Sequence, residues 1–219
     1  MARKSSRRRN QNPRRSLGTT TESLLRIIGG HFRGRTITYS GDPRTRPMKE
    51  RVREALFNLV GPSVKGMHAI DLFAGTGALG LEALSRGAAR VTFIERHFPT
   101  ARLIERNIAT LGVNDLSEVY AGDVFLWIRR QEDWAELVRH RWLVLCSPPY
   151  EFYTQRTDDM LGLLRGLHER APQGSLFVVE ADRSFDFELL ADLGPWDVRS
   201  YPPAVIGIAK VGPACRAGP

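Results

Sequence analysis

Residues 69–84 read AIDLFAGTGALGLEAL, and this stretch decides the fold. An apolar run ends in Asp71, and glycines follow at Gly75, Gly77 and Gly80. Glycine lets the backbone approach a ligand closely, and the N-terminus of a following helix presents free N–H groups. The stretch therefore predicts a buried strand, a ligand-binding turn and a helix.

Outward from this stretch, short apolar runs alternate with helical patterns along the chain. The spacing predicts strands near 67–73, 90–95, 117–121, 141–146, 175–180, 197–201 and 204–210, and helices near 77–86, 98–111, 123–130, 157–171 and 186–192. Such alternation is typical of a mostly parallel sheet covered by helices on both faces. We therefore expect a Rossmann-like α/β catalytic domain over residues 61–212, followed by a short tail at 213–219.

Positive charge is concentrated at the start of the chain, whose net charge is +8. Residues 1–23 lack apolar periodicity and carry seven Lys/Arg against one acid, which indicates a basic disordered arm. A positive segment of this kind is the footprint of a polyanion binder, because neutralised phosphates release counterions. A solubilising tail and an organelle transit peptide are the alternatives for this arm.

A second basic segment, residues 24–60, is expected to form a hairpin and a helix whose basic side chains face phosphates. Two β-prone runs in LLRIIGGHFRGRTITY (24–39) are separated by glycines. The run MKERVREALFNLV (48–60) places Val52, Leu56 and Leu59 on one helical face. We expect phosphate contacts from Arg26, Arg33, Arg35, Arg46, Lys49, Arg51 and Arg53.

Several classes of protein are disfavoured by composition. No stretch approaches the ~18 apolar residues that cross a bilayer, and no apolar signal core follows the basic start. Two cysteines are too few for a disulfide framework, and neither they nor the five histidines show metal-ligand spacing. We expect a cytoplasmic protein with no membrane association and no metal.

Three acidic residues end three successive predicted strands: Asp71, Glu95 and Asp123. Open α/β sheets bind ligands beyond the carboxyl ends of their strands, so together these acids indicate a nucleoside cofactor. Glu95 is placed to hold ribose hydroxyls, and Asp123 can face an adenine amino group or merely cap a helix. The turn itself also matches the nicotinamide-dinucleotide fingerprint, which leaves a dehydrogenase as an alternative.

The fourth strand ends in LVLCSPPY (143–150), where Pro148 and Pro149 impose a rigid turn and present Tyr150 beyond it. An aromatic face can stack a base withdrawn from its helix, and carbonyls near the prolines can accept hydrogen bonds from an exocyclic amine. This turn is therefore the expected place of a substrate base.

Several strings carry a family resemblance: RIIGGHFRGR (26–35), RPMKERVREALFN (46–58) and DLFAGTGALGLEALSRGA (71–88), together with Glu95, Asp123 and the PPY of 148–150. On these residues the chain resembles the bacterial 16S rRNA guanine-N2 methyltransferases of the RsmD type, over roughly residues 26–210. The resemblance implies a seven-stranded methyltransferase fold, S-adenosylmethionine as methyl donor and a flipped guanine in assembling ribosomes as substrate.

The resemblance also implies roles for individual residues and partners. Asp71 and the Gly75–Gly77 turn would hold the methionine part, Glu95 the ribose and Asp123 the adenine. The full expected cofactor set is Asp71, Phe73, Gly75, Thr76, Gly77, Glu95, Arg96, Asp123 and Val124, and the expected catalytic set is Ser147, Pro148, Pro149 and Tyr150. We expect ribosomal RNA or a small-subunit assembly intermediate as the partner of a monomer.

One departure from the family pattern concerns catalysis. Relatives usually carry Asp or Asn directly before the two prolines, and this chain has Ser147. A weakened hydrogen-bond acceptor at the reacting centre could cost about 10²–10³ in rate. Ser147 therefore favours, as an alternative, a ribosome-assembly factor that binds RNA without methylating it. A second alternative is methylation of an adenine N6 in nucleic acid, because the proline-proline-aromatic turn is shared by that broader group.

Overall fold

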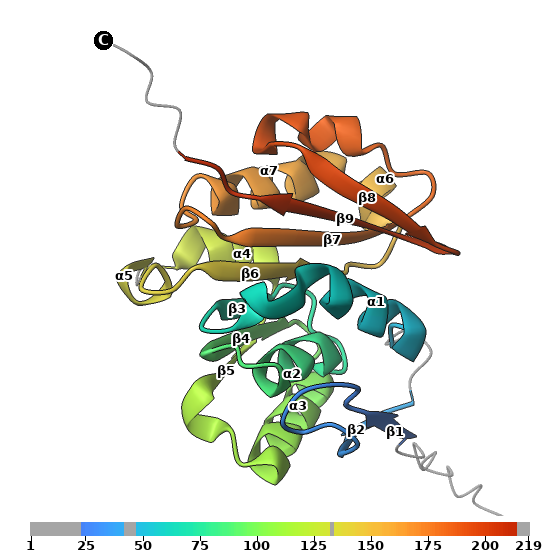
Figure 1. Ribbon diagram of the computed structural model, residues 1–219, viewed down its shortest axis with the longest axis vertical. Helices are drawn as coiled ribbons and strands as arrows, with labels where there is room; N and C mark the ends of the chain where they lie inside the picture. Colours follow the sequence, from blue (N-terminus) through green and yellow to red (C-terminus); the bar gives the residue numbers. More distant parts are fainter. Residues whose placement is uncertain (1–22, 42–46, 132–133, 214–219) are drawn as a thin grey trace, which may run out of the picture.

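The structure is a computed structural model that describes residues 23–41, 47–131 and 134–213. Within this part of the chain, seven strands form one sheet (Figure 1). Their order across the sheet is β5 (Ser117–Ala121), β4 (Arg90–Glu95), β3 (His68–Asp71), β6 (Trp142–Cys146), β7 (Leu176–Asp182), β9 (Ala204–Lys210) and β8 (Trp196–Tyr201). The five strands from β5 to β7 run parallel, and β9 is antiparallel to both of its neighbours. The expected mostly parallel α/β sheet is confirmed.

Two hydrophobic layers hold helices against opposite faces of this sheet. One layer includes apolar residues of α1 (Glu50–Val60), α2 (Ala78–Ser85) and α3 (Phe98–Leu111), and the other includes those of α4 (Val124–Arg130), α7 (Thr157–His168) and the 3-10 helix η3 (Phe187–Leu193). The central strands alternate between the layers, since Ala69 belongs to the first and Ile70 to the second. Strands β3 and β6 are buried along their whole length, as expected of parallel strands covered on both sides.

The direction of strand order reverses beside β3. From β3 the chain passes outward to β4 and β5, then returns to β6 on the other side of β3. In doubly wound sheets, ligands bind in the crevice outside the carboxyl ends of the strands at such a reversal. The topology thus places the ends of β3 and β6, namely Asp71 and Cys146, next to the expected site.

The N-terminal extension is a hairpin followed by a helix, as expected. β1 (Ser23–Arg26) pairs antiparallel with β2 (Thr36–Tyr39), and the hairpin lies beside α3 (Figure 1). The Asn107 side chain of α3 accepts a hydrogen bond from the Thr38 amide at 2.9 Å and donates one to the Thr38 carbonyl at 2.8 Å. The extension is therefore bonded through the backbone of β2 to α3, which packs on the seven-stranded sheet.

Some local expectations are corrected. Phe57 is buried on the apolar face of α1, whereas Leu59, which was expected there, is 37% exposed. The segment expected as a helix near 186–192 is the 3-10 helix η3. Two short helices, α5 (Trp134–Leu137) and α6 (Phe152–Gln155), and two 3-10 turns, η1 (Gly61–Val64) and η2 (Asn114–Leu116), were not expected. Among the helices of the described residues, none has the length and apolar character that crossing a membrane requires.

Candidate functional site

A cavity of about 720 Å³ opens at the carboxyl ends of the parallel strands. Residues from the loops after β3, β4, β5 and β6 line it together. Eleven of the thirteen residues expected to bind cofactor or act in catalysis are in this lining: Phe73, Gly75, Thr76, Glu95, Arg96, Asp123, Val124, Ser147, Pro148, Pro149 and Tyr150. Four loops that are distant in sequence therefore converge on one space.

Asp71 ends β3 and Gly77 directly precedes α2; neither is among the residues that line the cavity, and their contact with the cofactor stays a prediction. The Asp71 carboxylate is 1% exposed and accepts a hydrogen bond from the Gly80 amide at 3.0 Å through Oδ2. Gly77 has φ +75° and is the N-cap residue directly before α2. Both residues shape the turn from behind, because Asp71 fixes the first turn of α2 and Gly77 adopts a left-handed conformation that other residues avoid.

Asp71 is also a buried acid with an unsatisfied oxygen. Its Oδ1 atom has no hydrogen-bond partner within the described residues. Burial raises the pKa of the Asp71 carboxyl to about 7; the hydrogen bond from Gly80 opposes this rise, and the charge of Glu95 adds to it. A cation bound in the adjacent turn would stabilise the ionised form of this carboxyl.

Glu95 is held in a fixed orientation at the edge of the cavity. Its Oε2 accepts a hydrogen bond from the Gly75 amide at 2.8 Å, and its Oε1 accepts one from the His97 amide at 2.7 Å. A carboxylate oxygen has more than one acceptor site, so both oxygens can still accept a hydrogen bond from a ligand hydroxyl. The bond from Gly75 also ties the glycine turn after β3 to the end of β4.

Asp123 is the N-cap of α4. Its Oδ1 accepts hydrogen bonds from the amides of Phe125 at 2.8 Å and Leu126 at 3.3 Å. The capping role considered from the sequence is thus confirmed, and Asp123 lines the cavity as well. The helix N-terminus orients this carboxylate beside the cavity, so a cap and a ligand contact are compatible.

Three aromatic side chains, those of Phe73, Phe125 and Phe152, form part of the cavity wall. The Phe73 ring lies 5.9 Å from that of Phe152 and 6.3 Å from that of Phe125, both in edge-to-face arrangements. The Arg96 guanidinium lies 5.8 Å from the centre of the Phe152 ring. Phe125 and Phe152 were not expected, although both directly follow motifs that were recognised. These rings offer an apolar surface for a planar ligand.

The proline-proline turn after β6 meets a residue that sequence reasoning missed. The Ser147 hydroxyl donates a hydrogen bond to Oε2 of Glu180, and the Tyr150 hydroxyl donates one to Oε1 at 2.9 Å. Glu180 lies in β7, is 8% exposed and lines the cavity. Its signal in the sequence was an acid inside the apolar run LFVVEAD, near the end of a predicted strand.

The extension and the last hairpin close the cavity over this turn. Met48, Lys49 and Val52 contribute from the start of α1. Tyr201, Pro203 and Ala204 contribute from the connection between β8 and β9. The extension is therefore part of the cavity wall as well as a basic surface.

The basic residues of the extension have different environments. Arg33 and Lys49 are exposed, and Lys49 faces the cavity. The remaining exposed ones make contacts within the protein: Arg26 with Glu50 at 2.8 Å, Arg35 with the Thr110 carbonyl at 2.7 Å, and Arg51 with the Pro202 carbonyl at 2.9 Å. Arg46 lies outside the described residues.

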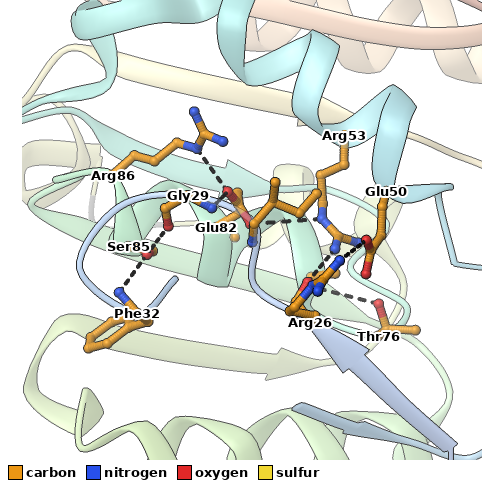
Figure 2. A network of polar contacts seen from close by, with 12 residues as sticks. Arg26, Gly29, Phe32, Glu50, Arg53, Thr76, Glu82, Ser85 and Arg86 are labelled. Carbon is orange, nitrogen blue, oxygen red and sulfur yellow. Dashed lines mark hydrogen bonds and ion pairs between the residues drawn. The ribbon is translucent and has the colours of Figure 1, made fainter. Parts of the chain in front are cut away.

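Arg53 is the exception, because its side chain is fully buried and cannot face phosphate in this conformation. It donates a hydrogen bond to the Arg26 carbonyl at 2.6 Å and lies beside Glu82 of α2. Figure 2 shows this network, in which Arg53 and Arg86 approach Glu82 from different sides. Burial lowers the pKa of Arg53, and the charge of Glu82 opposes that effect. Arg53 thus joins the extension to the domain.

Within residues 23–41, 47–131 and 134–213, no group of three or more His, Cys, Asp or Glu side chains could hold a metal ion.

Comparison with known proteins gives three results. The family model described as "Conserved hypothetical protein 95" matches residues 25–197. The ribosomal RNA small subunit methyltransferase D of Escherichia coli (strain K12) is 48% identical over 87 residues, which are 40% of this chain and 44% of that protein. The chain spans about half the length of the curated relatives it matches.

Two solved structures share the fold. An Escherichia coli protein, yhhF, named as a candidate methyltransferase, is 28% identical with a TM-score of 0.68, over 87% of this chain and 99% of that one. The Thermus thermophilus 16S rRNA N2 G1207 methyltransferase, solved in complex with AdoMet and guanosine, is 19% identical with a TM-score of 0.64, over 86% of this chain and 50% of that one. The expected Rossmann-like methyltransferase fold is confirmed.

Proposed function

The chain belongs to the family described as conserved hypothetical protein 95, and from that premise we propose that it transfers a methyl group from S-adenosylmethionine to the exocyclic N2 of a guanine in 16S ribosomal RNA. One observation carries the proposal. A single cavity is lined by the glycine turn after β3, by Glu95 at the end of β4, by Asp123 after β5 and by the proline-proline-tyrosine turn after β6. Such a cavity can hold a nucleoside cofactor and a nucleobase side by side. The curated name of the Escherichia coli relative supports ribosomal RNA as the substrate.

The residues present fit the cofactor. Glu95 would accept hydrogen bonds from the ribose hydroxyls, and Asp123 would accept one from the adenine amino group. The backbone at Gly75 and Thr76 would approach the methionine part, with the buried charge of Asp71 behind it. When bound, the cofactor supplies a methyl group on a sulfonium, whose departure leaves a neutral thioether. The apolar wall at Phe73 would exclude water from this charged sulfur.

The turn after β6 would hold the guanine. Pro148 and Pro149 rigidify the backbone, and the Glu180 carboxylate fixes the hydroxyl of Tyr150 at 2.9 Å. A fixed aromatic side chain can stack a base that has been withdrawn from its helix. Holding the reacting atoms ~3–3.5 Å apart can supply much of the barrier lowering.

RNA outside the cavity would be bound by the extension. Arg33, Arg35 and Arg51 are exposed, and Lys49 lies at the cavity itself. We propose that these residues contact phosphates of ribosomal RNA or of a small-subunit assembly intermediate, and that the protein acts as a cytoplasmic monomer. The basic arm at 1–23 would add to this attraction.

Two measurements test the proposed function. Calorimetry with S-adenosylmethionine and with its demethylated product should give saturable binding. A tritiated-methyl assay on naked 16S RNA and on small-subunit assembly intermediates should then transfer label, and mass spectrometry should locate it on guanine N2. Label found on adenine N6 would show that adenine, and not guanine, is the methylated base. Binding of another nucleotide in place of this donor would overturn the proposal.

The alternative function, an RNA-binding assembly factor without catalysis, is favoured by one observation: the residue before the two prolines is a neutral serine. The same assay separates the two functions. Tight binding of donor and RNA with no transferred label, on either naked or assembling RNA, would establish the binding factor and exclude the enzyme.

A further inference from the structure

The parallel pairing of β6 and β7 places a hydroxyl and a carboxylate side by side. Cys146 lies opposite Val179 in the register of these strands. Because both strands run in the same direction, the next residues along them, Ser147 and Glu180, are also neighbours. Ser147 donates a hydrogen bond to Oε2 of Glu180, and both residues line the cavity. The contact therefore follows from the sheet itself and not from a mobile loop.

Within the part of the chain that the structure describes, the donors to the Glu180 carboxylate are two hydroxyl groups, those of Ser147 and Tyr150. Its Oε1 accepts from Tyr150 at 2.9 Å, and its backbone carbonyl accepts from the Tyr153 hydroxyl at 2.8 Å. The residue is 8% exposed, and no ion pair to it is present in the described parts of the chain. Because no cation of the described residues pairs with it, the Glu180 carboxylate interacts mainly with its hydroxyl donors.

The proposed reaction needs such a group. The lone pair of guanine N2 is delocalised into the ring, and the nitrogen acquires positive charge as it bonds to the methyl carbon. It must then lose a proton. A serine hydroxyl is neutral and by itself a weak base, but a carboxylate one hydrogen bond away can draw off the hydroxyl proton.

Resting on the proposed function, we propose that Glu180 is the proton acceptor of this site and acts through Ser147. The guanine nitrogen forms a bond to the methyl carbon, and the carbon–sulfur bond breaks with its electron pair left on sulfur. The N2 proton passes to Oγ of Ser147 as the serine proton passes to Oε2 of Glu180. The amine has then lost one proton, Glu180 has become a carboxylic acid and Ser147 is unchanged. Tyr150 keeps the other carboxylate oxygen in place.

The relay is tested by removing the carboxylate at position 180 and then placing a carboxylate at position 147. Glu180→Gln should lower the single-turnover rate of methyl transfer by about 10²–10³ while leaving the dissociation constant of the cofactor unchanged. The double variant Ser147→Asp with Glu180→Gln puts a carboxylate directly at the turn, with an amide beside it as donor, and should recover at least about tenfold of that loss. A structural role for Glu180 predicts no recovery. Glu188→Gln, an exposed acid that follows β7, is the matched control.

A binding measurement tests the same contact without turnover. Guanosine 5′-monophosphate carries the exocyclic amine, and inosine 5′-monophosphate lacks it. Calorimetry in the presence of the demethylated cofactor should show wild-type protein preferring the guanine nucleotide by about tenfold or more, because its exocyclic amine can donate a hydrogen bond to the charged network. Both Glu180→Gln and Ser147→Ala should abolish that preference.

The outcomes distinguish this inference from the proposed function. An active wild-type protein whose Glu180→Gln variant keeps the full rate and the full nucleotide preference overturns the relay alone. A wild-type protein that transfers no methyl group to RNA overturns the proposed function, and the relay with it. If Glu180→Gln does not fold, Ser147→Ala decides, since it removes the relay and leaves Glu180 in place; full activity of that variant contradicts the inference.

Discussion

The Nε atom of Arg53 lies 3.8 Å from Oε2 of Glu82, and the two side chains are 1% and 0% exposed. Arg53 belongs to α1 of the extension and Glu82 to α2, directly after the glycine turn. The Glu82 carboxylate also accepts hydrogen bonds from the amides of Ile28 and Gly29, each at 2.8 Å (Figure 2). One buried acid thus holds both the hairpin and the helix of the extension.

Removing the charge of Glu82 should destabilise the protein strongly. Glu82→Gln removes the anion that contributes most to balancing the buried charge of Arg53, and breaking a buried pair in this way costs about 3–5 kcal/mol. Urea denaturation followed by circular dichroism measures the change in the free energy of unfolding. Glu105→Gln, an exposed position on α3, should change it by no more than about 0.5 kcal/mol. Equal effects of the two substitutions would show that the buried pair is not a link.

Substitutions at Gly30 and Gly34, two glycines between β1 and β2, distinguish the cost of backbone strain from the cost of a steric clash. Gly30 and Gly34 have φ of +75° and +84°, but a Cβ at Gly30 would overlap the backbone oxygen of Ser85, whereas space is open at Gly34. Gly34→Ala should cost the conformational strain alone, roughly 1–2 kcal/mol. Gly30→Ala should cost about 1–3 kcal/mol more, because the hairpin must move off α2. Thermal unfolding of both variants measures the difference, and equal melting temperatures would contradict it.

The raised pKa of Asp71 predicts a particular pH dependence of stability. The ordinary value is 3.8 and the folded value is about 7, so the folded state keeps a proton that the unfolded chain has lost. The contribution of this group to stability therefore falls as the pH rises from about 4 to 7, and it is constant above that range. The Asp71→Asn variant has no carboxyl at this position, so its stability does not contain this pH-dependent decrease.

The stability of Asp71→Asn relative to wild type should accordingly increase by up to about 4 kcal/mol between pH 4 and pH 8. Urea denaturation across this range measures the difference between the two proteins and removes the contribution of all other titrating groups. A difference that stays constant with pH would show that folding does not raise the pKa of Asp71.

Glu95 should govern cofactor affinity. Its carboxylate is oriented by the Gly75 and His97 amides, and Glu95→Gln replaces one acceptor oxygen by a donor. Hydrogen bonds to charged groups contribute about 1.5–3 kcal/mol, so the dissociation constant of S-adenosylmethionine should rise by about 10- to 100-fold. Calorimetry measures it, with Glu118→Gln on the neighbouring strand as an exposed control. An unchanged affinity would remove Glu95 from the proposed ribose contact.

Arg33 should contribute to RNA binding through charge alone. Its side chain is exposed and forms no hydrogen bond or ion pair with the described residues, so Arg33→Gln disturbs no internal bond. Removing one phosphate contact lowers the slope of log affinity against log salt by about 0.7–0.9. Filter binding across a salt series measures the slope. Arg139 precedes β6, at the opposite end of the strands from the cavity. Arg139→Gln should therefore leave the slope unchanged. The same slope for Arg33→Gln and wild type would exclude Arg33 from the interface.

Strands and helices whose residues form a clear local hydrophobic pattern could be predicted from the sequence. The bounds of β4, β5 and β9 and of α3 agree with the predicted ones, because each is an apolar run or an amphipathic repeat closed by turn residues. The convergence of the loops that carry Glu95, Asp123 and Pro148 was also predictable, since parallel strands bring their carboxyl ends to one edge.

Features that depend on tertiary partners could not be predicted. Arg53 carries a charge inside a basic helix, and only the position of Glu82 on another helix explains its burial. Glu180 becomes a site residue through the register of β6 and β7, which the sequence does not specify. Phe57 replaces Leu59 on the buried face of α1 because the domain, and not the helix alone, decides which face is covered.

The contacts of the hairpin with α2 and α3 restrict the order in which the parts of this protein can fold. The groups that hold residues 28–38 are the Glu82 carboxylate, the Ser85 hydroxyl and the Asn107 amide, which all lie at least 53 residues further along the chain. Synthesis proceeds from the N-terminus, so the extension leaves the ribosome before any of its partners exists. The extension can therefore dock only after α2 and α3 have been made, and only then does it complete the cavity wall.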